Sequence, residues 1–206
     1  MEKWNTIPNN EIIKKTAQAL SQNGFEVSIV ENSEEAKQKV LEIVPEGSEV
    51  MVMTSETLRT LGLEEYFSGS GKYDAVKNKL ATMPDTVGRE KKKLGAAAAV
   101  SIGSVHAITH DGKVLIASNT GSQLPGYVYG SDSVVWVVGA QKIVADFNEG
   151  MERLEKYVVP LETERARKAY GLPETFHTFI SKLLVYNREV TPNRVKIVLV
   201  KEVLGF

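Results

Sequence analysis

The stretch GSVHAITHDGKVLIASNTGSQLPGYVYGSDSVVWVVGAQK, residues 103–142, combines strand-like apolar runs with polar turns and two of the chain's three histidines. The apolar runs are residues 105–108, 114–117 and 134–138. Between them stand the turn-forming pairs Asp111-Gly112, Thr120-Gly121 and Pro125-Gly126. Short apolar runs separated by such pairs predict strands that carry polar loops to one place.

The residues before this stretch alternate between helical and strand-like patterns. A helix with one apolar face is predicted from Asn9 or Asn10, either of which can cap it, to the pair Asn23-Gly24. The next predicted elements are a strand at 25–30, a helix from Ser33 and a buried strand at 49–53. This alternation predicts an α/β fold with a parallel sheet.

The segment between residues 62 and 101 is less regular. Residues 67–73 (FSGSGKY) are predicted to form a flexible turn or loop, and residues 95–101 (GAAAAVS) fit either a buried strand or a packed helix end. The basic residues at 89–93 predict a solvated helix face, with an anion or partner patch as the alternative. Because no aromatic residues interleave with them, we do not expect nucleic acid to bind there.

The last third of the chain begins with a helix whose apolar stripe runs to Val158 and which Pro160 is expected to break. A charged helix at 161–170 is predicted to follow. Residues 183–186 and 195–200 are predicted to form a terminal hairpin. The helix and hairpin at about 160–206 would thus extend a single domain spanning residues 1–206. The apolar end of the chain could also pair with a second copy in a homodimer.

Composition excludes several classes of function. The 206 residues carry a net charge of -1, so no overall attraction to nucleic acid or to an anionic membrane is expected. The absence of cysteine excludes disulfides, thiolate-bound zinc and iron–sulfur clusters held by this chain. No segment approaches the roughly 18 apolar residues of a membrane span, and residues 1–15 lack the apolar core of a signal peptide. We therefore expect a soluble, cytoplasmic protein.

Polar residues follow the predicted strands at three places. They are Thr54, Ser55 and Thr57 after the first buried strand, Ser118, Asn119, Thr120, Gly121, Ser122 and Gln123 after the second strand of residues 103–142, and Gln141 and Lys142 after the last. Ligands of α/β sheets bind at the carboxyl ends of strands, so we expect these residues to bind a small anion. The alternatives are helix capping for the first group, a hydrogen-bonded loop for the second and a surface position for Lys142.

The histidines and one arginine are the remaining candidates. His106 lies in an apolar run, where a core histidine and a functional one are both reasonable; a functional His106 would act as a general base or donate to an anion. His110 is expected in a solvated turn. No metal-ligand spacing is present, so no metal is predicted, and no cofactor is indicated. Arg165 is expected to face solvent, with a position in the site as the alternative.

Several segments together resemble the lactate-utilisation (LUD) domain proteins, which include lactate utilization protein C. They are SETLRTLGL at 55–63, GSVHAITHDG at 103–112, ASNTGSQLP at 117–125, WVVGAQKIV at 136–144 and PLETERARKAYG at 160–171. The resemblance implies a Rossmann-like three-layer α/β/α sandwich of the ribose-5-phosphate isomerase, glucosamine-6-phosphate deaminase and CoA-transferase type. It covers most of the chain.

The resemblance also implies a role in converting lactate to pyruvate within a multi-subunit system. In that system a different subunit, which contains cysteines, carries the iron–sulfur clusters. The resemblance therefore implies an iron–sulfur or oxidoreductase protein as the partner. Two hypotheses follow. In the first, the protein is an enzyme that binds a small hydroxy acid, keto acid or phosphorylated metabolite and transfers a proton on it. In the second, it is a non-catalytic subunit or a ligand-sensing module of an oxidoreductase assembly.

Overall fold

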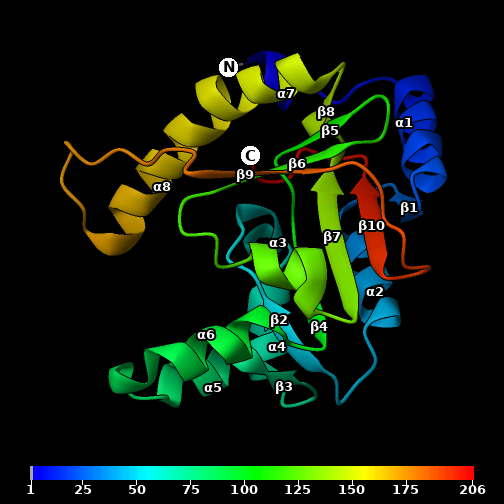
Figure 1. Cartoon of the computed structure of the whole chain (residues 1–206). Helices are drawn as coiled ribbons and strands as arrows, with labels where there is room; N and C mark the ends of the chain where they lie inside the picture. Colours follow the sequence, from blue (N-terminus) through cyan, green and yellow to red (C-terminus); the bar gives the residue numbers. More distant parts are fainter. Residues whose placement is uncertain (1) are drawn as a thin grey trace.

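A computed structural model describes residues 2–206 and shows two β-sheets with helices packed around them (Figure 1). The helices are α1 (Asn10–Gln22), α2 (Ser33–Ile43), α3 (Glu56–Thr60), α4 (Leu63–Gly69), α5 (Val76–Thr82), α6 (Gly88–Ala96), α7 (Phe147–Arg153) and α8 (Val159–Tyr170). The strands are β1 (Glu26–Val30), β2 (Glu49–Val52), β3 (Asp74–Ala75), β4 (Val100–Gly103), β5 (Ala107–Thr109), β6 (Val114–Ser118), β7 (Ser133–Gly139), β8 (Ile143–Val144), β9 (Lys182–Tyr186) and β10 (Val195–Val200).

The main sheet has six strands in the order β1-β10-β7-β4-β2-β3, and every pair is parallel. Its central strands are buried on both faces. Along β7, Val134, Trp136 and Val138 pack in the cluster that contains α1, whereas Val135 and Val137 pack in the cluster that contains α2, α3 and α4. A strand covered on both faces reads as a continuous apolar run, as β7 does. The predicted α/β/α sandwich with a parallel sheet is confirmed.

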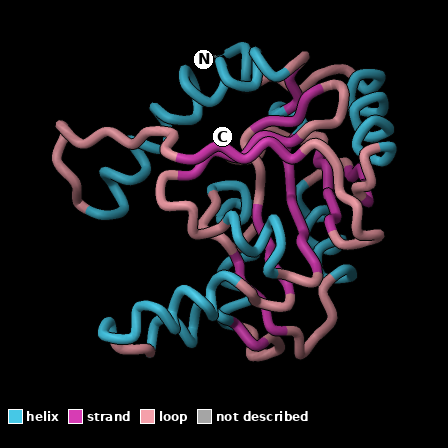
Figure 2. The backbone as a smooth tube through the Cα atoms, viewed as in Figure 1, coloured by secondary structure: helices cyan, strands magenta, loops and turns pink. Residues whose placement is uncertain are grey.

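The second sheet has four strands in the order β8-β5-β6-β9 (Figure 2). Strands β5 and β6 form an antiparallel hairpin, and His110 is exposed at its tip, in the solvated turn that was predicted for it. One face of this sheet contributes Ile108, Val114 and Ile116 to the cluster shared with the main sheet. Its other face packs Ala107 and Leu115 against the helical segment that contains Leu154 and Val158. The small sheet therefore lies between the main sheet and that segment.

The predicted elements of the first half agree with the structure, with one exception. Asn9 caps α1, accepting a hydrogen bond from the Ile12 N–H at 2.9 Å. The exception is the expected loop at 67–73, because Phe67 belongs to α4 and is 1% exposed in the core. Its ring packs 4.5 Å from that of Tyr73. Only the start of the segment is therefore helical and packed, since residues 70–73 form bends and residues 69–72 are exposed.

Pro160 does not break the helix that precedes it, contrary to the expectation. The chain continues helically from α7 through the π-helical segment η5 (Leu154–Val158) into α8, and Pro160 lies in the first turn of α8. Proline is tolerated in a first turn because its missing N–H is not needed there. The π-helical turn just before it fits the absence of this N–H, because the regular hydrogen-bond pattern of the α-helix is interrupted there. The helix ends at Gly171, whose φ of +60° is the left-handed conformation that glycine accepts readily.

The predicted terminal hairpin is wrong. Strand β9 pairs with β6 in the small sheet, whereas β10 lies between β1 and β7 in the main sheet. Residues 160–206 are therefore no extension, since they supply a central strand of the fold. Both edges of β10 are occupied, so this strand has no free edge for a second copy, and the homodimer stays a prediction.

The basic residues 89–93 lie on α6, which has no buried residue, so the solvated helix face is confirmed. Lys91 pairs with Asp85 at 2.8 Å. Residues 95–101 contain both of the predicted alternatives, a helix end and a buried strand, since α6 ends at Ala96 and β4 begins at Val100. Among residues 2–206, no helix is long and apolar enough to cross a membrane.

Candidate functional site

A pocket lies where the chain crosses twice from the main sheet to the small sheet. The first crossing, residues 104–106, joins β4 to β5, and the second, Ala140–Lys142, joins β7 to β8. Because the strands of the main sheet are parallel, both crossings leave its carboxyl edge, where the residues after β2 also lie. Ser104, His106 and Lys142 are thus brought into the wall of one cavity, with Thr54 and Ser55 beside them.

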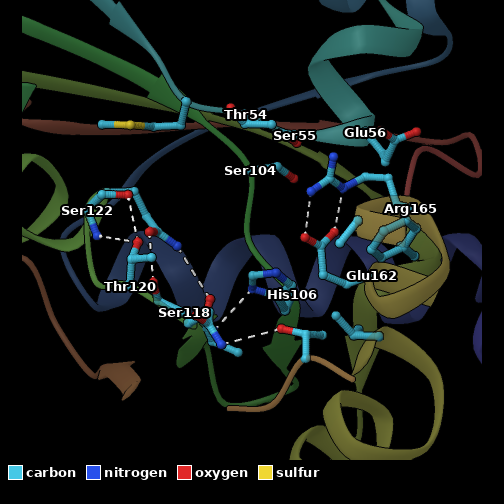
Figure 3. A pocket seen from close by; sticks show the side chains of 18 of the residues that line it. Thr54, Ser55, Glu56, Ser104, His106, Ser118, Thr120, Ser122, Glu162 and Arg165 are labelled. Atoms are coloured by element: carbon cyan, nitrogen blue, oxygen red, sulfur yellow. Dashed lines mark hydrogen bonds and ion pairs between the residues drawn. The ribbon is translucent and has the colours of Figure 1, made fainter. Parts of the chain in front are cut away.

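The cavity has a volume of about 410 Å³, which is within the usual range for sites of small molecules. Figure 3 shows Ser118, Thr120 and Ser122 on one side of it and the Glu162–Arg165 pair on the other, with His106 between them. Of the predicted site residues, the following line the cavity: Thr54, Ser55, His106, Ser118, Asn119, Thr120, Ser122, Gln123 and Lys142. The structure places Thr57, Gly121 and Gln141 outside its lining.

Lys142 is 1% exposed, and its amino group has no carboxylate partner among the described side chains, residues 3–206. Its Nζ lies 3.0 Å from Thr57 Oγ1, 3.2 Å from Ser104 Oγ and 3.1 Å from the carbonyl oxygen of Val105. Burial, and secondarily the positive charge of Arg153, hold the pKa of Lys142 well below its ordinary value. A buried cation without a counter-ion is costly, and an anion in the cavity would relieve that cost.

His106 is held as a neutral donor. Its Nδ1 accepts the Ala117 backbone N–H at 3.1 Å, so the ring proton is on Nε2. Desolvation, with smaller contributions from Lys142 and Arg153, lowers the pKa of His106 to about 3. Of the two roles considered for this residue, the geometry favours donation to an anion over general base catalysis, because the only free ring position carries a proton.

Arg153 is a second buried cation, and it lies behind His106. Its side chain is 0% exposed, and Nη1 donates to the His106 carbonyl oxygen at 2.5 Å. Nε and Nη2 have no hydrogen-bond partner among the described residues, and the guanidinium lies over the Tyr157 ring. One buried basic group, Lys142, thus lines the pocket, and a second, Arg153, lies behind it, which favours anionic ligands.

The polar loop after β6 is ordered by its own hydrogen bonds. Ser118 Oγ donates to Gln123 Oε1 at 2.9 Å and accepts the Gly121 N–H at 2.8 Å. Thr120 Oγ1 and Ser122 Oγ are 3.1 Å apart. Gly121 turns the loop with φ +85° and faces the Lys182 side chain instead of the cavity. The loop is thus both a hydrogen-bonded structure and a wall of hydroxyl groups, so the two interpretations are compatible.

The residues after β2 have different tasks. Ser55 precedes the first turn of α3, but its side chain makes no capping hydrogen bond, so its hydroxyl is not used for capping. Thr54 Oγ1 lies 3.4 Å from the Nζ of Lys77, which also lines the cavity. Thr57 is 1% exposed, and its hydroxyl donates to the Leu204 carbonyl oxygen at 3.1 Å. It therefore positions Lys142 and does not face the ligand space.

Gln141 holds the last residues of the chain beside Thr57. Its Nε2 donates to the carbonyl oxygens of Leu204 at 3.0 Å and Gly205 at 3.2 Å. A side chain at Gly205, where φ is +60°, would place its Cβ only 2.6 Å from Thr57 Oγ1. This close approach brings Phe206 to the cavity wall. Gln141 thus supports the site from behind.

The wall opposite the hydroxyl loop comes from α8 and the residues after it. Arg165 forms a bidentate pair with Glu162, Nε–Oε2 at 2.6 Å and Nη2–Oε1 at 2.7 Å, and this carboxylate raises the pKa of Arg165. Next to this pair (Figure 3), Glu56 pairs with Arg59, and the two arginines lower its pKa. Arg165 therefore lies in the site. The charged helix predicted a solvent-facing arginine, with this position as the alternative. Both carboxylates of the cavity are occupied by arginines.

Sequence reasoning missed Ser104, Phe176 and Phe179. Ser104 stands within the quoted GSVH motif, directly after a strand, and that position was the signal for it. Phe176 and Phe179 belong to a loop whose approach to the cavity depends on long-range contacts, which no local pattern encodes. Among residues 2–206, no group of three histidine or carboxylate side chains is arranged to hold a metal ion.

Comparison with known proteins places this chain in a family. The family model described as LUD domain matches residues 13–200. The crystal structure of a DUF162 family protein from Deinococcus radiodurans is similar with a TM-score of 0.57 at 13% identity, covering 95% of this chain and 99% of that one. Ribose 5 phosphate isomerase A from Neisseria gonorrhoeae has a TM-score of 0.34 at 16% identity, covering 77% and 76%. No curated protein sequence matches. Because the family model spans most of its length, the chain belongs to the LUD domain family.

Proposed function

We propose that this protein binds a small anionic metabolite, a hydroxy or keto acid or a phosphorylated compound, at the carboxyl edge of its main sheet. The observation that carries the proposal is Lys142, a buried cation without a carboxylate partner in the wall of a cavity. The anion would face Lys142 and accept hydrogen bonds from the hydroxyls of Ser55, Ser104 and Ser122, the last of which is held by the Thr120 hydroxyl. In this environment charge-assisted hydrogen bonds are stronger than in water.

Membership in the LUD family supports lactate or pyruvate as members of the ligand class. The proposal then places the protein in the conversion of lactate to pyruvate. An enzymatic role would require a group that moves a proton beside the carbonyl. Lys142 is better suited to this than His106, because burial lowers the pKa of its amino group, whereas the Nδ1 lone pair of His106 is already engaged.

The second candidate is a non-catalytic, ligand-sensing subunit of an oxidoreductase assembly. The specific observation in its favour is that both cavity carboxylates, Glu56 and Glu162, are paired with arginines and His106 is a neutral donor. Such a site binds without an obvious acid–base pair. Co-purification of an iron–sulfur or oxidoreductase partner, together with ligand binding but no turnover, would favour this candidate.

The test is a thermal-shift screen with lactate, pyruvate, sugar phosphates, nucleotides and CoA thioesters. A ligand at 100 times its dissociation constant stabilises a protein by about 2.7 kcal/mol. For a chain of this size, the midpoint would rise by roughly 5 to 10 °C. The double variant Ser55→Ala/Thr120→Ala should lose the shift, and Thr86→Ala, which is exposed and outside the cavity, should keep it. An unchanged shift in the double variant would refute these contacts.

A further inference from the structure

The cavity is divided into a polar half and an apolar half. The polar half holds Lys142, Ser104 and the hydroxyls of the loop after β6. The apolar half is lined by Val158, Tyr170, Phe176, Phe179, Ile180 and Phe206, next to the Glu162–Arg165 pair. A ligand that only carried a charge and a hydroxyl would contact the first half and leave the second in water.

The apolar half is held in place by specific contacts. Arg167 Nε donates to the Phe176 carbonyl oxygen at 2.9 Å, and Thr163 Oγ1 accepts the Thr178 N–H at 3.2 Å. From the opposite wall, Asn119 Nδ2 reaches the Phe179 carbonyl oxygen at 3.4 Å. The loop after α8 is thereby tied both to its own helix and to the polar loop. Its aromatic side chains are part of the same site as the hydroxyl groups.

Phe179 is 64% exposed although it lines the cavity. Large apolar side chains that remain exposed beside a polar site are typical of surfaces that a ligand covers. The neighbouring Tyr170 is 65% exposed, and the Arg165 guanidinium lies 5.7 Å from its ring centroid. Aromatic walls of this kind favour a flat apolar group, because rings pack edge-on or offset against one another.

The volume of the cavity points the same way. At about 30 Å³ for one water molecule in the liquid, lactate with six heavy atoms needs only a fraction of the 410 Å³ present. Most of the space and the whole aromatic wall would remain hydrated with so small a ligand. The hydrophobic contribution to binding is proportional to the apolar area removed from water, so a larger ligand with an apolar group gains from this wall.

Resting on the anion-binding function proposed above, we propose that the ligand is an amphipathic acid. Its carboxylate faces Lys142 and the hydroxyls, and an aromatic side chain of about phenyl size packs on Phe176 and Phe179. The substrate class is thus an aromatic 2-hydroxy or 2-keto acid in preference to lactate or pyruvate.

Calorimetric titration with matched pairs of acids tests this proposal. Lactate is compared with 3-phenyllactate, and pyruvate with phenylpyruvate, on the wild type. Burial of a phenyl ring predicts about tenfold to hundredfold tighter binding of the aromatic member of each pair. Phe179→Ala and Phe176→Ala should remove most of that preference, measured as the ratio of the two affinities within each pair of acids. Phe147→Ala, a partly exposed phenylalanine outside the cavity, is the control and should preserve it.

The outcomes separate the two proposals. Equal affinity for lactate and 3-phenyllactate overturns the amphipathic ligand and leaves the anion site intact. An aromatic preference that survives both phenylalanine variants also overturns it, because the ring would then bind elsewhere. Absence of binding by all four acids, with the wild type folded by circular dichroism, overturns the amphipathic acid, and the anion site is then decided by the phosphorylated compounds of the thermal-shift screen. Since Phe179 is exposed, its substitution leaves the core packing intact, and the variant remains a fair test.

Discussion

Lys142 Nζ lies 3.0 Å from the hydroxyl oxygen of Thr57, although 85 positions separate the two residues in the chain. Thr57 uses its own proton to donate to the Leu204 carbonyl oxygen, so toward Lys142 it can only accept. This contact joins the end of β7 to α3 and to the last residues of the chain. It orients an uncompensated cation at the pocket wall, and the proposed function depends on it.

The buried Lys142 predicts a pH dependence of stability. Its pKa is lowered in the folded protein from 10.5, so the unfolded chain binds the proton at pH values where the folded one has lost it. The free energy of unfolding should therefore rise with pH from the lowered pKa up to about 10.5, by as much as about 1.4 kcal/mol per pH unit. Lys142→Met should lack this rise, and Lys39→Met, at a partly exposed surface position, should keep it. Urea denaturation across this range checks the slope, and equal slopes for wild type and Lys142→Met would contradict the assignment.

His106 predicts a second pH effect, on the acid side. Its pKa falls from 6.5 to about 3 on folding, so the unfolded state takes up the proton first as the pH is lowered. Stability should be lost progressively between pH 6.5 and about 3. His106→Gln, whose amide oxygen can still accept the Ala117 N–H, should be less sensitive to acid. His110→Gln at the hairpin tip serves as the control and should follow the wild-type profile in acid denaturation followed by circular dichroism.

A side chain at Gly103 would collide with Tyr127. An added Cβ would lie 1.6 Å from Tyr127 Oη, and the buried ring packs edge-on against Trp136, 5.4 Å away. Gly103→Ala should therefore destabilise the protein by about 1 to 3 kcal/mol or more. Adding Tyr127→Phe should recover part of the loss because the hydroxyl is removed. Gly69→Ala, which meets nothing within 4 Å, should change the unfolding free energy by less than about 0.5 kcal/mol. No difference between the two glycine variants in denaturant titration would refute the collision.

The Glu162–Arg165 pair predicts a charge effect on ligand affinity. Arg165→Met leaves the Glu162 carboxylate unpaired beside the cavity, which should weaken anion binding roughly tenfold. The double variant Arg165→Met/Glu162→Gln should regain most of the affinity if Arg165 only neutralises Glu162. A double variant as weak as the single one would instead show that Arg165 contacts the anion itself. Titration of pyruvate or phenylpyruvate into each variant measures the difference.

Much of the fold was readable from the sequence, because local rules determine it. Asn9 caps α1 as its residue type predicts, and the unbroken apolar run of β7 is typical of a strand covered on both faces. Strand β10 is equally apolar, yet its neighbours are β1 and β7, far away in sequence. Proximity in the chain suggested a hairpin with β9, whereas burial of both faces required the centre of the main sheet.

The candidate site was predicted in part for the same reason. Residues that follow parallel strands, such as Thr54 and Lys142, could be placed at one edge from topology alone. That Thr57 and Gln141 support the site from behind depends on the returning chain at Leu204 and Gly205, which strand patterns do not reveal. The aromatic wall likewise depends on a loop without regular structure, held by side-chain to backbone hydrogen bonds.

The central claim is that an anion binds against Lys142. The most direct measurement is calorimetric titration of pyruvate and phenylpyruvate into wild type, Lys142→Met and Lys39→Met, each in two buffers of different protonation enthalpy. Because burial lowers the Lys142 pKa and a bound anion raises it, wild type and Lys39→Met should take up protons on binding, and Lys142→Met should lose both the uptake and most of the affinity. Unchanged affinity and proton uptake in Lys142→Met would contradict the account.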